Sequence, residues 1–178
     1  MRLIQGDWIR YLVVVNGRYE VNMKDFPDMD EDFKLWGILG QTFDVVLKTR
    51  QKELYRYDLS AVEAGTLWAI QTIGEKATPT KITRWLLREP HTVTELLNRM
   101  VKKGLVTKTN DLERRNMIRI SVTEKGRQAY GQSTKRKSIH KVMSSLSEEE
   151  RQQLMASLRK LRDRAFKELR IEYKPFFT

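Results

Sequence analysis

Residues 78–126 constrain the fold of this chain more than any other stretch. Two segments whose apolar residues recur at helical spacing meet at Glu89-Pro90. Two short β-branched runs then flank a charged loop, and Thr123 starts another segment with helical features. Proline fits the first turn of a helix but not its interior, so Pro90 ends one helix and begins the next. The expected order is helix, tight turn, helix and β-hairpin.

The two helices carry start and stop signals. Thr78 followed by Pro79 is the pairing expected of an N-cap and a first helical residue. The second helix should stop before Gly104, because glycine readily takes the left-handed conformation that follows a helix. Residues 105–109 and 117–122 are expected to form strands. The predicted buried faces of the two helices consist of Ile82, Trp85, Leu86, Val93, Leu96, Leu97, Met100 and Val101.

This order of elements is the layout of a winged helix-turn-helix domain, whose second helix enters the major groove of DNA. The helix that begins at Pro90 has the polar outer face such a role needs. Arg114 and Arg115, at the tip of the loop between the strands, suit the narrow minor groove. An ordinary amphipathic surface helix and a solvated charged turn are the alternatives. The predicted DNA-binding residues are His91, Thr92, Thr94, Glu95, Asn98, Arg99, Lys102, Arg114 and Arg115.

Individual side chains of the second helix match groups on DNA. The hydroxyls of Thr92 and Thr94, in the first turns, suit phosphates. Asn98 can pair with adenine, and Arg99 can pair with guanine or a phosphate. Glu95 can accept a hydrogen bond from cytosine N4, or it can pair with Arg99 one helical turn later.

The distribution of charge favours a polyanionic partner. The formal net charge is +11 over 178 residues. Residues 81–127 hold twelve basic and five acidic side chains, a surplus of seven, so most of the excess lies in this stretch. Nucleic acid is the first expectation and a membrane surface the second. A generally basic surface is the alternative that charge by itself leaves open.

Other features of the composition exclude several functions. The absence of cysteine removes disulfides, thiolate zinc sites and thiol redox sensing. Only His91 and His140 are present, far apart in the sequence, and no metal-ligand spacing is visible, so no cofactor or metal is predicted. The chain has neither a glycine-rich phosphate loop nor a Ser/His/Asp set, which argues against an enzyme. No apolar run can span a bilayer and no signal-peptide pattern appears, so a cytoplasmic protein without membrane contact is expected.

The segments on either side organise the rest of the chain. Residues 1–30 form an N-terminal extension, in which Asn16-Gly17 between two β-like runs favours a hairpin over a disordered or partly helical arm. Residues 31–57 read as a first long helix, and residues 58–126 as the DNA-binding domain, which opens on a Ser60 capping box. In residues 127–178 we expect one long helix from Thr123 to about residue 146 and a second after a Ser147 capping box. The predicted fold is mainly α with a small β-wing.

From about Asp32 to Leu169 the chain resembles the MarR family of winged-helix regulators. The most specific part is Lys102-Lys103-Gly104-Leu105-Val106, then Arg114-Arg115, then Val122-Thr123-Glu124-Lys125-Gly126. The resemblance implies a homodimer in which the first and last helices of two chains interlock over a palindromic DNA site. Apolar stripes in residues 36–47, 142–146 and 154–169 offer material for such dimerisation helices, although an intramolecular bundle would also explain any one of them.

The resemblance also implies a small aromatic effector, bound between the dimerisation helices and the DNA-binding lobe. Aromatic residues and one arginine are the candidates to line its pocket, although aromatics at helical spacing more often form core. These candidates are Trp36, Phe43, Arg50, Tyr55 and Trp68. The function expected overall is a transcriptional regulator, acting as a repressor on a palindromic operator and released by a ligand. The alternative is a non-specific architectural DNA-binding protein.

Overall fold

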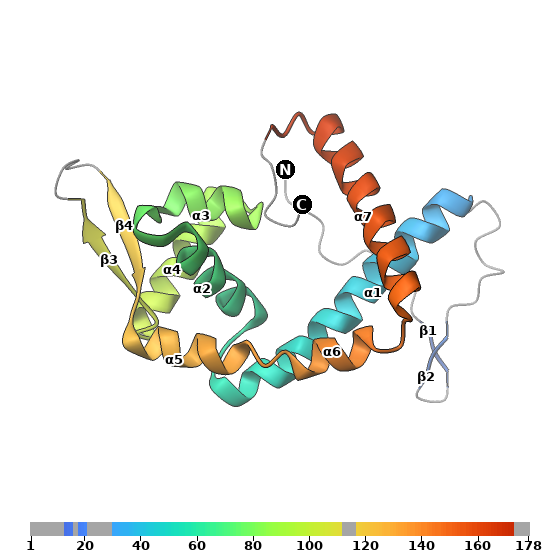
Figure 1. The fold of residues 1–178 in the computed structure, drawn as a ribbon, viewed down its shortest axis with the longest axis horizontal. Helices are drawn as coiled ribbons and strands as arrows, with labels where there is room; N and C mark the ends of the chain where they lie inside the picture. The colour runs from blue at the N-terminus through green and yellow to red at the C-terminus, as the bar shows by residue number, and fades with distance from the viewer. Residues whose placement is uncertain (1–12, 16–17, 21–29, 112–116, 173–178) are drawn as a thin grey trace. The chain divides into compact units, whose positions relative to one another are not determined.

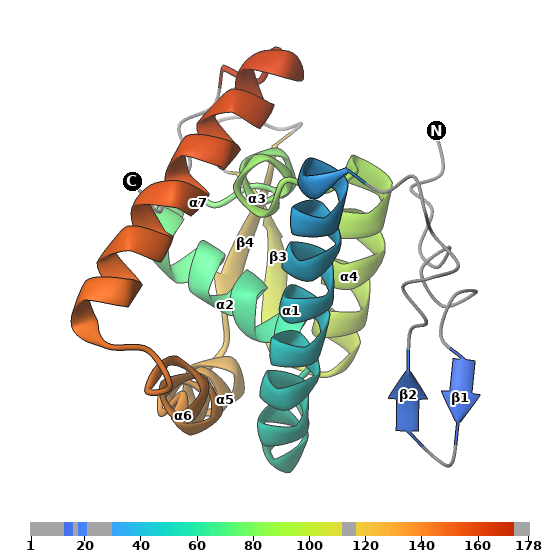
Figure 2. The same ribbon diagram turned by 90° about the vertical axis from the view of Figure 1, so that its right-hand side faces the viewer.

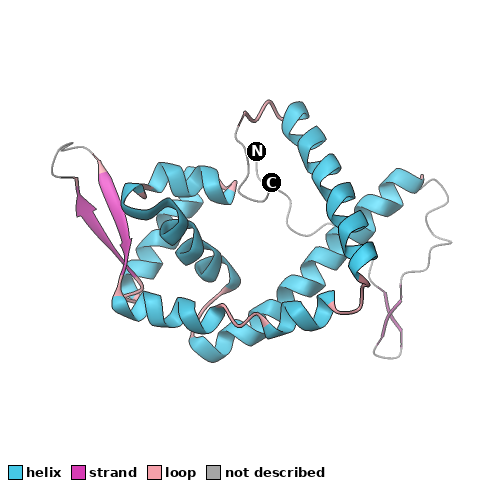
Figure 3. Cartoon of the chain, viewed as in Figure 1, coloured by secondary structure: helices cyan, strands magenta, loops and turns pink. Residues whose placement is uncertain are grey.

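The first helix of the chain, α1 (Glu31–Leu54), is long (Figure 1). The computed structural model describes residues 13–15, 18–20, 30–111 and 117–172. By its contacts the chain divides into Met1–Phe43 and Asp44–Thr178. Helices make up most of the described residues, and the strands form two small hairpins (Figure 3). The expectation of a mainly helical chain with a small β-wing is confirmed.

The first unit contains the expected N-terminal hairpin and the start of α1. Strands β1 (Val13–Val15) and β2 (Arg18–Glu20) pair antiparallel, with Val14 opposite Tyr19. The turn at residues 16–17 lies outside the described residues. Asp30 caps α1, because its carboxylate accepts a hydrogen bond from the backbone N–H of Phe33 at 2.7 Å.

The second unit begins with the end of α1, a 3-10 turn (Tyr55–Tyr57) and α2 (Ala61–Ile73). The predicted capping box at the start of α2 is present. The Glu63 backbone N–H donates to Ser60 Oγ at 3.1 Å, and the Glu63 carboxylate accepts from the Ser60 backbone N–H at 2.8 Å. This reciprocal pair fixes where α2 starts. A second 3-10 turn, Gly74–Lys76, leads to the next helix.

Helices α3 (Pro79–Leu86) and α4 (Pro90–Lys102) form the helix-turn-helix. Thr78 caps α3 as predicted, accepting from the Lys81 N–H at 3.3 Å. The tight turn between the helices passes through Leu87, whose φ of 51° is left-handed. The end of α4 is a Schellman motif: the Gly104 N–H donates to the Val101 carbonyl and the Leu105 N–H to the Met100 carbonyl. Gly104 has a φ of 70°, so glycine meets a real conformational need there.

The wing follows directly. Strands β3 (Val106–Asn110) and β4 (Ile118–Val122) pair antiparallel, with Lys108 opposite Ile120. Both strands start one residue later than the sequence predicted. For β3 the reason is that the Leu105 N–H still closes the end of α4. The Ile120 N–H donates to the Ala77 carbonyl at 3.0 Å, which ties the hairpin to the chain just before α3.

One hydrophobic core joins these elements. Strand β4 contacts α2 and α3, and β3 contacts α4 (Figure 2). The large fully buried apolar side chains come from the end of α1, the residues before α2, α2, α3, α4, β3 and β4: Leu54, Leu59, Leu67, Ile82, Val93, Leu96, Leu97, Met100, Val106 and Ile120. Helices α3 and α4 are therefore held by their apolar faces, and their polar faces are left to solvent.

The prediction of one long helix after Thr123 is wrong. The chain forms α5 (Glu124–Ser133), breaks at residues 134–136 and resumes as α6 (Lys137–Met143). Arg136 sits in the left-handed region with a φ of 45°, and the Glu53 carboxylate of α1 accepts hydrogen bonds from the N–H groups of Lys137 and Ser138. This cap comes from a residue 84 positions away, so no local pattern could reveal it. Helix α7 (Glu148–Glu168) then begins at the predicted Ser147 capping box.

Candidate nucleic-acid interface

Helix α4 separates its side chains onto two faces, as the sequence predicted. Val93, Leu97 and Met100 are 0% exposed and Leu96 is 1% exposed, all packed in the core. The exposed residues include the predicted reading residues His91, Thr94, Glu95, Asn98, Arg99 and Lys102. Val101 is also exposed, at 38%, so its predicted place on the buried face is wrong: it lies three residues after Asn98, on the solvent side of the helix. Thr92 is half-buried at the first turn. The predicted residues that belong to α4 therefore lie on its outer surface, and their contact with DNA stays a prediction.

The contacts of two of these side chains bear on their expected roles. Thr94 Oγ1 donates to the Pro90 carbonyl at 2.9 Å, so its proton is used inside the helix. To donate to a phosphate, Thr94 would first have to give up that bond. Glu95 and Arg99 form no ion pair with each other in the described part of the chain, although both are exposed. Both charged groups are thus open to an outside partner.

Asn98 contacts the wing. Lys108 Nζ of β3 donates to Asn98 Oδ1 of α4 at 2.6 Å. The predicted DNA-binding set omitted Lys108. The position of Lys108 in the sequence could have indicated this contact. Alternate residues of a strand lie on the same face, and Lys108 comes two residues after Val106, which is buried.

The base of the wing is braced by an ion pair. Arg119 Nε donates to Asp111 Oδ2 at 2.6 Å, and the Asp111 side chain is only 8% exposed. The Asp111 N–H also donates to the Met117 carbonyl at 2.7 Å. Asp111 thus ties the start of the loop to Arg119 of β4. Arg114 and Arg115 lie outside the described residues.

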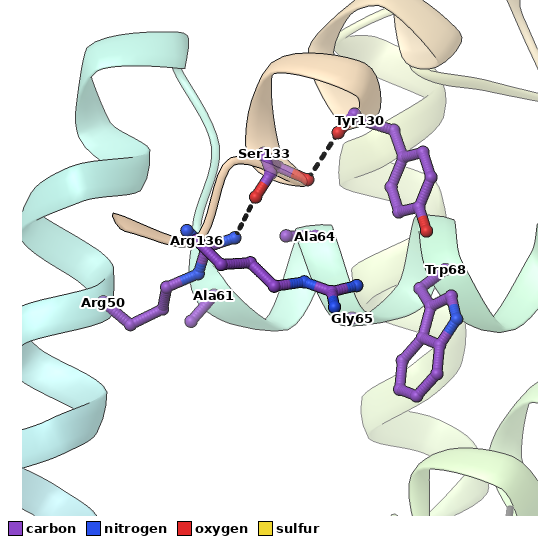
Figure 4. Close-up of a pocket in the computed structure, with 8 residues that line it drawn as sticks. All are labelled: Arg50, Ala61, Ala64, Gly65, Trp68, Tyr130, Ser133 and Arg136. Carbon is purple, nitrogen blue, oxygen red and sulfur yellow. Dashed lines mark hydrogen bonds between the residues drawn. The ribbon is translucent and has the colours of Figure 1, made fainter. Parts of the chain in front are cut away.

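A hollow of about 190 Å³ lies where the end of α1, α2 and the end of α5 meet (Figure 4). Of the five predicted pocket residues, Arg50 and Trp68 line it. Tyr55 is 72% exposed and is not among the lining residues. Trp36 and Phe43 belong to the first unit. The remaining lining residues, which the sequence did not single out, are Ala61, Ala64, Gly65, Tyr130, Ser133 and Arg136.

The walls of this hollow combine aromatic and cationic groups. Arg50 donates through a guanidinium nitrogen to the Ser133 carbonyl, and Ser133 Oγ donates to the Tyr130 carbonyl at 2.7 Å (Figure 4). Trp68 also stacks edge-to-face on Trp85 of α3, with ring centroids 4.7 Å apart. The hollow is thus in contact, through one aromatic pair, with the first helix of the helix-turn-helix.

Arg50 and Glu53 hold both sides of the α5–α6 break. Arg50 binds the last residue of α5, while Glu53 caps α6 and accepts from Arg50 at 2.8 Å. Burial by itself would raise the pKa of Glu53, but hydrogen bonds from Ser138, Arg50 and Lys137 outweigh it and lower the pKa to about 2. Glu53 is therefore a carboxylate at neutral pH, and it anchors the break to α1.

The described part of the chain supports neither a metal site nor a membrane-spanning helix. Its histidine, aspartate and glutamate residues form no cluster of three that could hold a metal ion. Among the same residues, no helix has the length and apolar character needed to cross a membrane.

The geometry defines a winged helix-turn-helix protein: a tight turn joins α3 to α4, and a two-stranded wing follows α4. Residues 57–116 match the model of the MarR family. This match begins at the end of the first 3-10 turn and includes α2, α3, α4 and β3, and it confirms the resemblance read from the sequence. No curated protein sequence matches the chain.

Solved structures show the same fold over most of the chain. The organohalide-sensing transcriptional regulator RdhR-CbdbA1625, in its 2,4-dichlorophenol-bound form, is 27% identical, with a TM-score of 0.73 over 85% of this chain and 89% of that chain. A mutant MarR from E. coli complexed with operator DNA is 18% identical, with a TM-score of 0.65 over 75% and 99%. S. aureus MepR in a DNA complex is 23% identical, with a TM-score of 0.64 over 77% and 99%.

Proposed function

We propose that this protein is a transcriptional repressor that binds a palindromic site in double-stranded DNA as a homodimer. The observation that carries the proposal is the outer face of α4, where six exposed polar or charged residues stand on a helix that is held in the core by Val93, Leu96, Leu97 and Met100. A helix fixed in this way can enter the major groove without losing its own packing. The DNA-bound MarR and MepR structures, which share the fold, support this reading.

Exposed apolar side chains on α1 and α7 support the homodimer. In α1 they are Phe33, Leu35, Trp36, Ile38, Leu39, Phe43, Val45 and Leu47, and in α7 they are Leu154, Met155, Leu158 and Leu161. Leaving apolar area in water costs roughly 25 cal/mol per Å², so this many exposed groups favour burial against a second chain. A two-fold dimer would place its two α4 helices about one DNA turn, roughly 10 bp, apart.

A small aromatic effector, bound in the hollow lined by Arg50 and Trp68, completes the proposal. Trp68 and Tyr130 offer aromatic surface, and Arg50 and Arg136 offer positive charge for an ionised hydroxyl or carboxylate. The related regulator solved with 2,4-dichlorophenol supports a ligand of this size and type. Occupancy would disturb the Arg50–Ser133 contact at the α5–α6 break and so change the spacing of the two reading helices.

The strong positive charge of the chain favours one other function, that of an architectural protein that binds DNA without sequence preference. In vitro selection from a random pool of duplexes separates the two. A repressor enriches a few sequences built from two inverted half-sites. An even spread of sequences, bound with equal affinity, would exclude the proposed function and leave the architectural one.

A further inference from the structure

The contact between Lys108 and Asn98 fixes how one reading residue presents its polar atoms. Lys108 Nζ lies 2.6 Å from Asn98 Oδ1. An ammonium group has only donors, so the amide atom that faces it must be the oxygen and not the nitrogen. The Asn98 amide is thereby oriented by chemistry: its oxygen accepts from Lys108, and its NH2 group is left to donate to another partner.

The position of Lys108 is set by the core of the lobe. On β3, Lys108 lies on the same face as Val106, which is 1% exposed and packs within the core that includes α4. Its partner across the hairpin is Ile120, which is 2% exposed and donates its N–H to the Ala77 carbonyl. The backbone that carries Lys108 is therefore held on both sides, and its side chain starts beside α4.

This arrangement disfavours adenine. The Asn98 oxygen has a second lone pair, but an adenine N6–H donor that used it would approach the Lys108 ammonium, which is also a donor and is positively charged. A bidentate contact to adenine needs an amide oxygen that accepts from N6–H and an amide nitrogen that donates to N7. With the Asn98 oxygen bound to Lys108, the pair offers the N–H groups of Asn98 and the remaining N–H groups of the ammonium. Guanine presents two acceptors, O6 and N7, in the major groove. A protein surface that offers only donors therefore fits guanine.

We propose that Lys108 is a specificity-determining residue and that the Asn98–Lys108 pair reads guanine, where Asn98 alone would read adenine. Lys108 acts as a positioning residue for the Asn98 amide and adds a donor of its own. This inference rests on the proposed function, since it needs α4 to lie in the major groove.

In vitro selection from a random duplex pool tests the pair directly, using the full chain and four variants. Asn98→Ala identifies the position that Asn98 reads, because preference is lost there. Wild type should prefer guanine at that position by roughly tenfold, the discrimination of one good base contact. Lys108→Met should shift the preference toward adenine, because the amide oxygen is released. Lys108→Arg, which also only donates, should keep guanine.

Lys81→Met is the matched control, because it removes one exposed positive charge from α3, lies outside the predicted DNA-binding set and does not touch Asn98. It should change the affinity for all sequences alike and leave the base preference unchanged. The enriched site also allows a second readout. Replacing the guanine with 7-deazaguanine, which lacks the N7 acceptor, should weaken binding by wild type more than binding by Lys108→Met.

Three results would overturn the inference. Adenine preferred by wild type at the Asn98 position would contradict it. So would a Lys108→Met variant that binds all sequences more weakly but keeps the guanine preference, because Lys108 would then act as a phosphate contact. In both cases the enriched sites would still support the proposed regulator. A wild-type pool without any enriched sequence would instead exclude specific reading, and this inference with it.

Discussion

The ammonium of Lys103, the residue that closes α4, lies 3.2 Å from the Glu63 carboxylate in the first turn of α2. The Glu63 side chain is only 6% exposed, and the same ammonium donates to the Asp58 carbonyl at 3.0 Å. Glu63 also accepts from the Ser60 N–H. The end of the reading helix is thus tied to the capping box of the helix behind it by one charged contact.

Replacing Lys103 with methionine should lower the free energy of unfolding by about 1–3 kcal/mol, because a buried carboxylate loses its charged partner. Urea denaturation at pH 7 measures the change. The neighbouring Lys102→Met is the control: Lys102 is exposed, so its loss should change the stability by less than about 0.5 kcal/mol. Equal stability of the two variants would show that the Lys103 contact contributes little.

Gly126 should tolerate no side chain. A Cβ built there would lie 2.1 Å from the Leu105 carbonyl oxygen and 2.8 Å from Val122 Cγ1. Gly126→Ala should therefore destabilise the protein by about 1–3 kcal/mol, since the start of α5 must move away from the chain it packs on.

Gly131, in the same helix, has room for a side chain, because a Cβ added there would meet no atom within 4 Å. Gly131→Ala should stabilise the protein by roughly 0.5–1 kcal/mol, because alanine is the better helix former. Thermal unfolding of both variants measures the contrast. Changes of the same sign would contradict the packing described for Gly126.

Glu53 should make the stability depend on acid pH. Its pKa falls from 4.5 to about 2 in the folded chain, so its contribution is present above pH 4.5 and is lost as the pH falls toward 2. A shift of this size corresponds to at most about 3 kcal/mol. Urea denaturation of wild type and Glu53→Gln over this pH range should show a difference that shrinks with falling pH. A difference that stays constant from pH 7 to pH 2 would contradict the assigned role.

Filling the hollow should remove the response to an effector. Gly65 lines it, and a Cβ there meets no atom within 4 Å, so Gly65→Leu can occupy the space without disturbing the core. With wild type, 2,4-dichlorophenol is expected to weaken DNA binding, and with Gly65→Leu it should not. Binding of the enriched duplex is measured with and without the phenol for both proteins. An equal response of the two proteins would place the effector elsewhere.

The local parts of the fold could be predicted from the sequence. Ser60, Thr78, Gly104 and Ser147 each mark a helix boundary through their own backbone or side-chain chemistry, and each lies where predicted. The outer face of α4 could be predicted from the 3.6-residue period. Because Val93, Leu96, Leu97 and Met100 share the buried face, the polar residues between them must lie on the opposite face.

Contacts between distant residues could not be predicted in this way. The α5–α6 break depends on Glu53, and the orientation of Asn98 depends on Lys108 of another element. Tyr130 and Arg136 line the hollow only because α5 ends beside α1 and α2. The periodicity of apolar residues within one helix does not show which residues of other elements that helix will contact.

Arg99 should contribute to base recognition more than to overall affinity. It is exposed in the last turn of α4, where an arginine can bind guanine at two atoms. Arg99→Ala should cost about 1–3 kcal/mol on the enriched duplex and much less on a scrambled one. Fluorescence anisotropy with both duplexes measures this. An equal loss on both duplexes would make Arg99 a phosphate contact.

The most direct test of the central claim, that α4 reads DNA sequence, compares the dissociation constants of wild type for the enriched duplex and a scrambled duplex of equal composition. Both are measured at two salt concentrations. The predicted result is a preference of roughly 1,000-fold or more for the enriched duplex, with binding to both falling steeply as salt rises. Equal affinity for the two duplexes at both salt concentrations would contradict the claim.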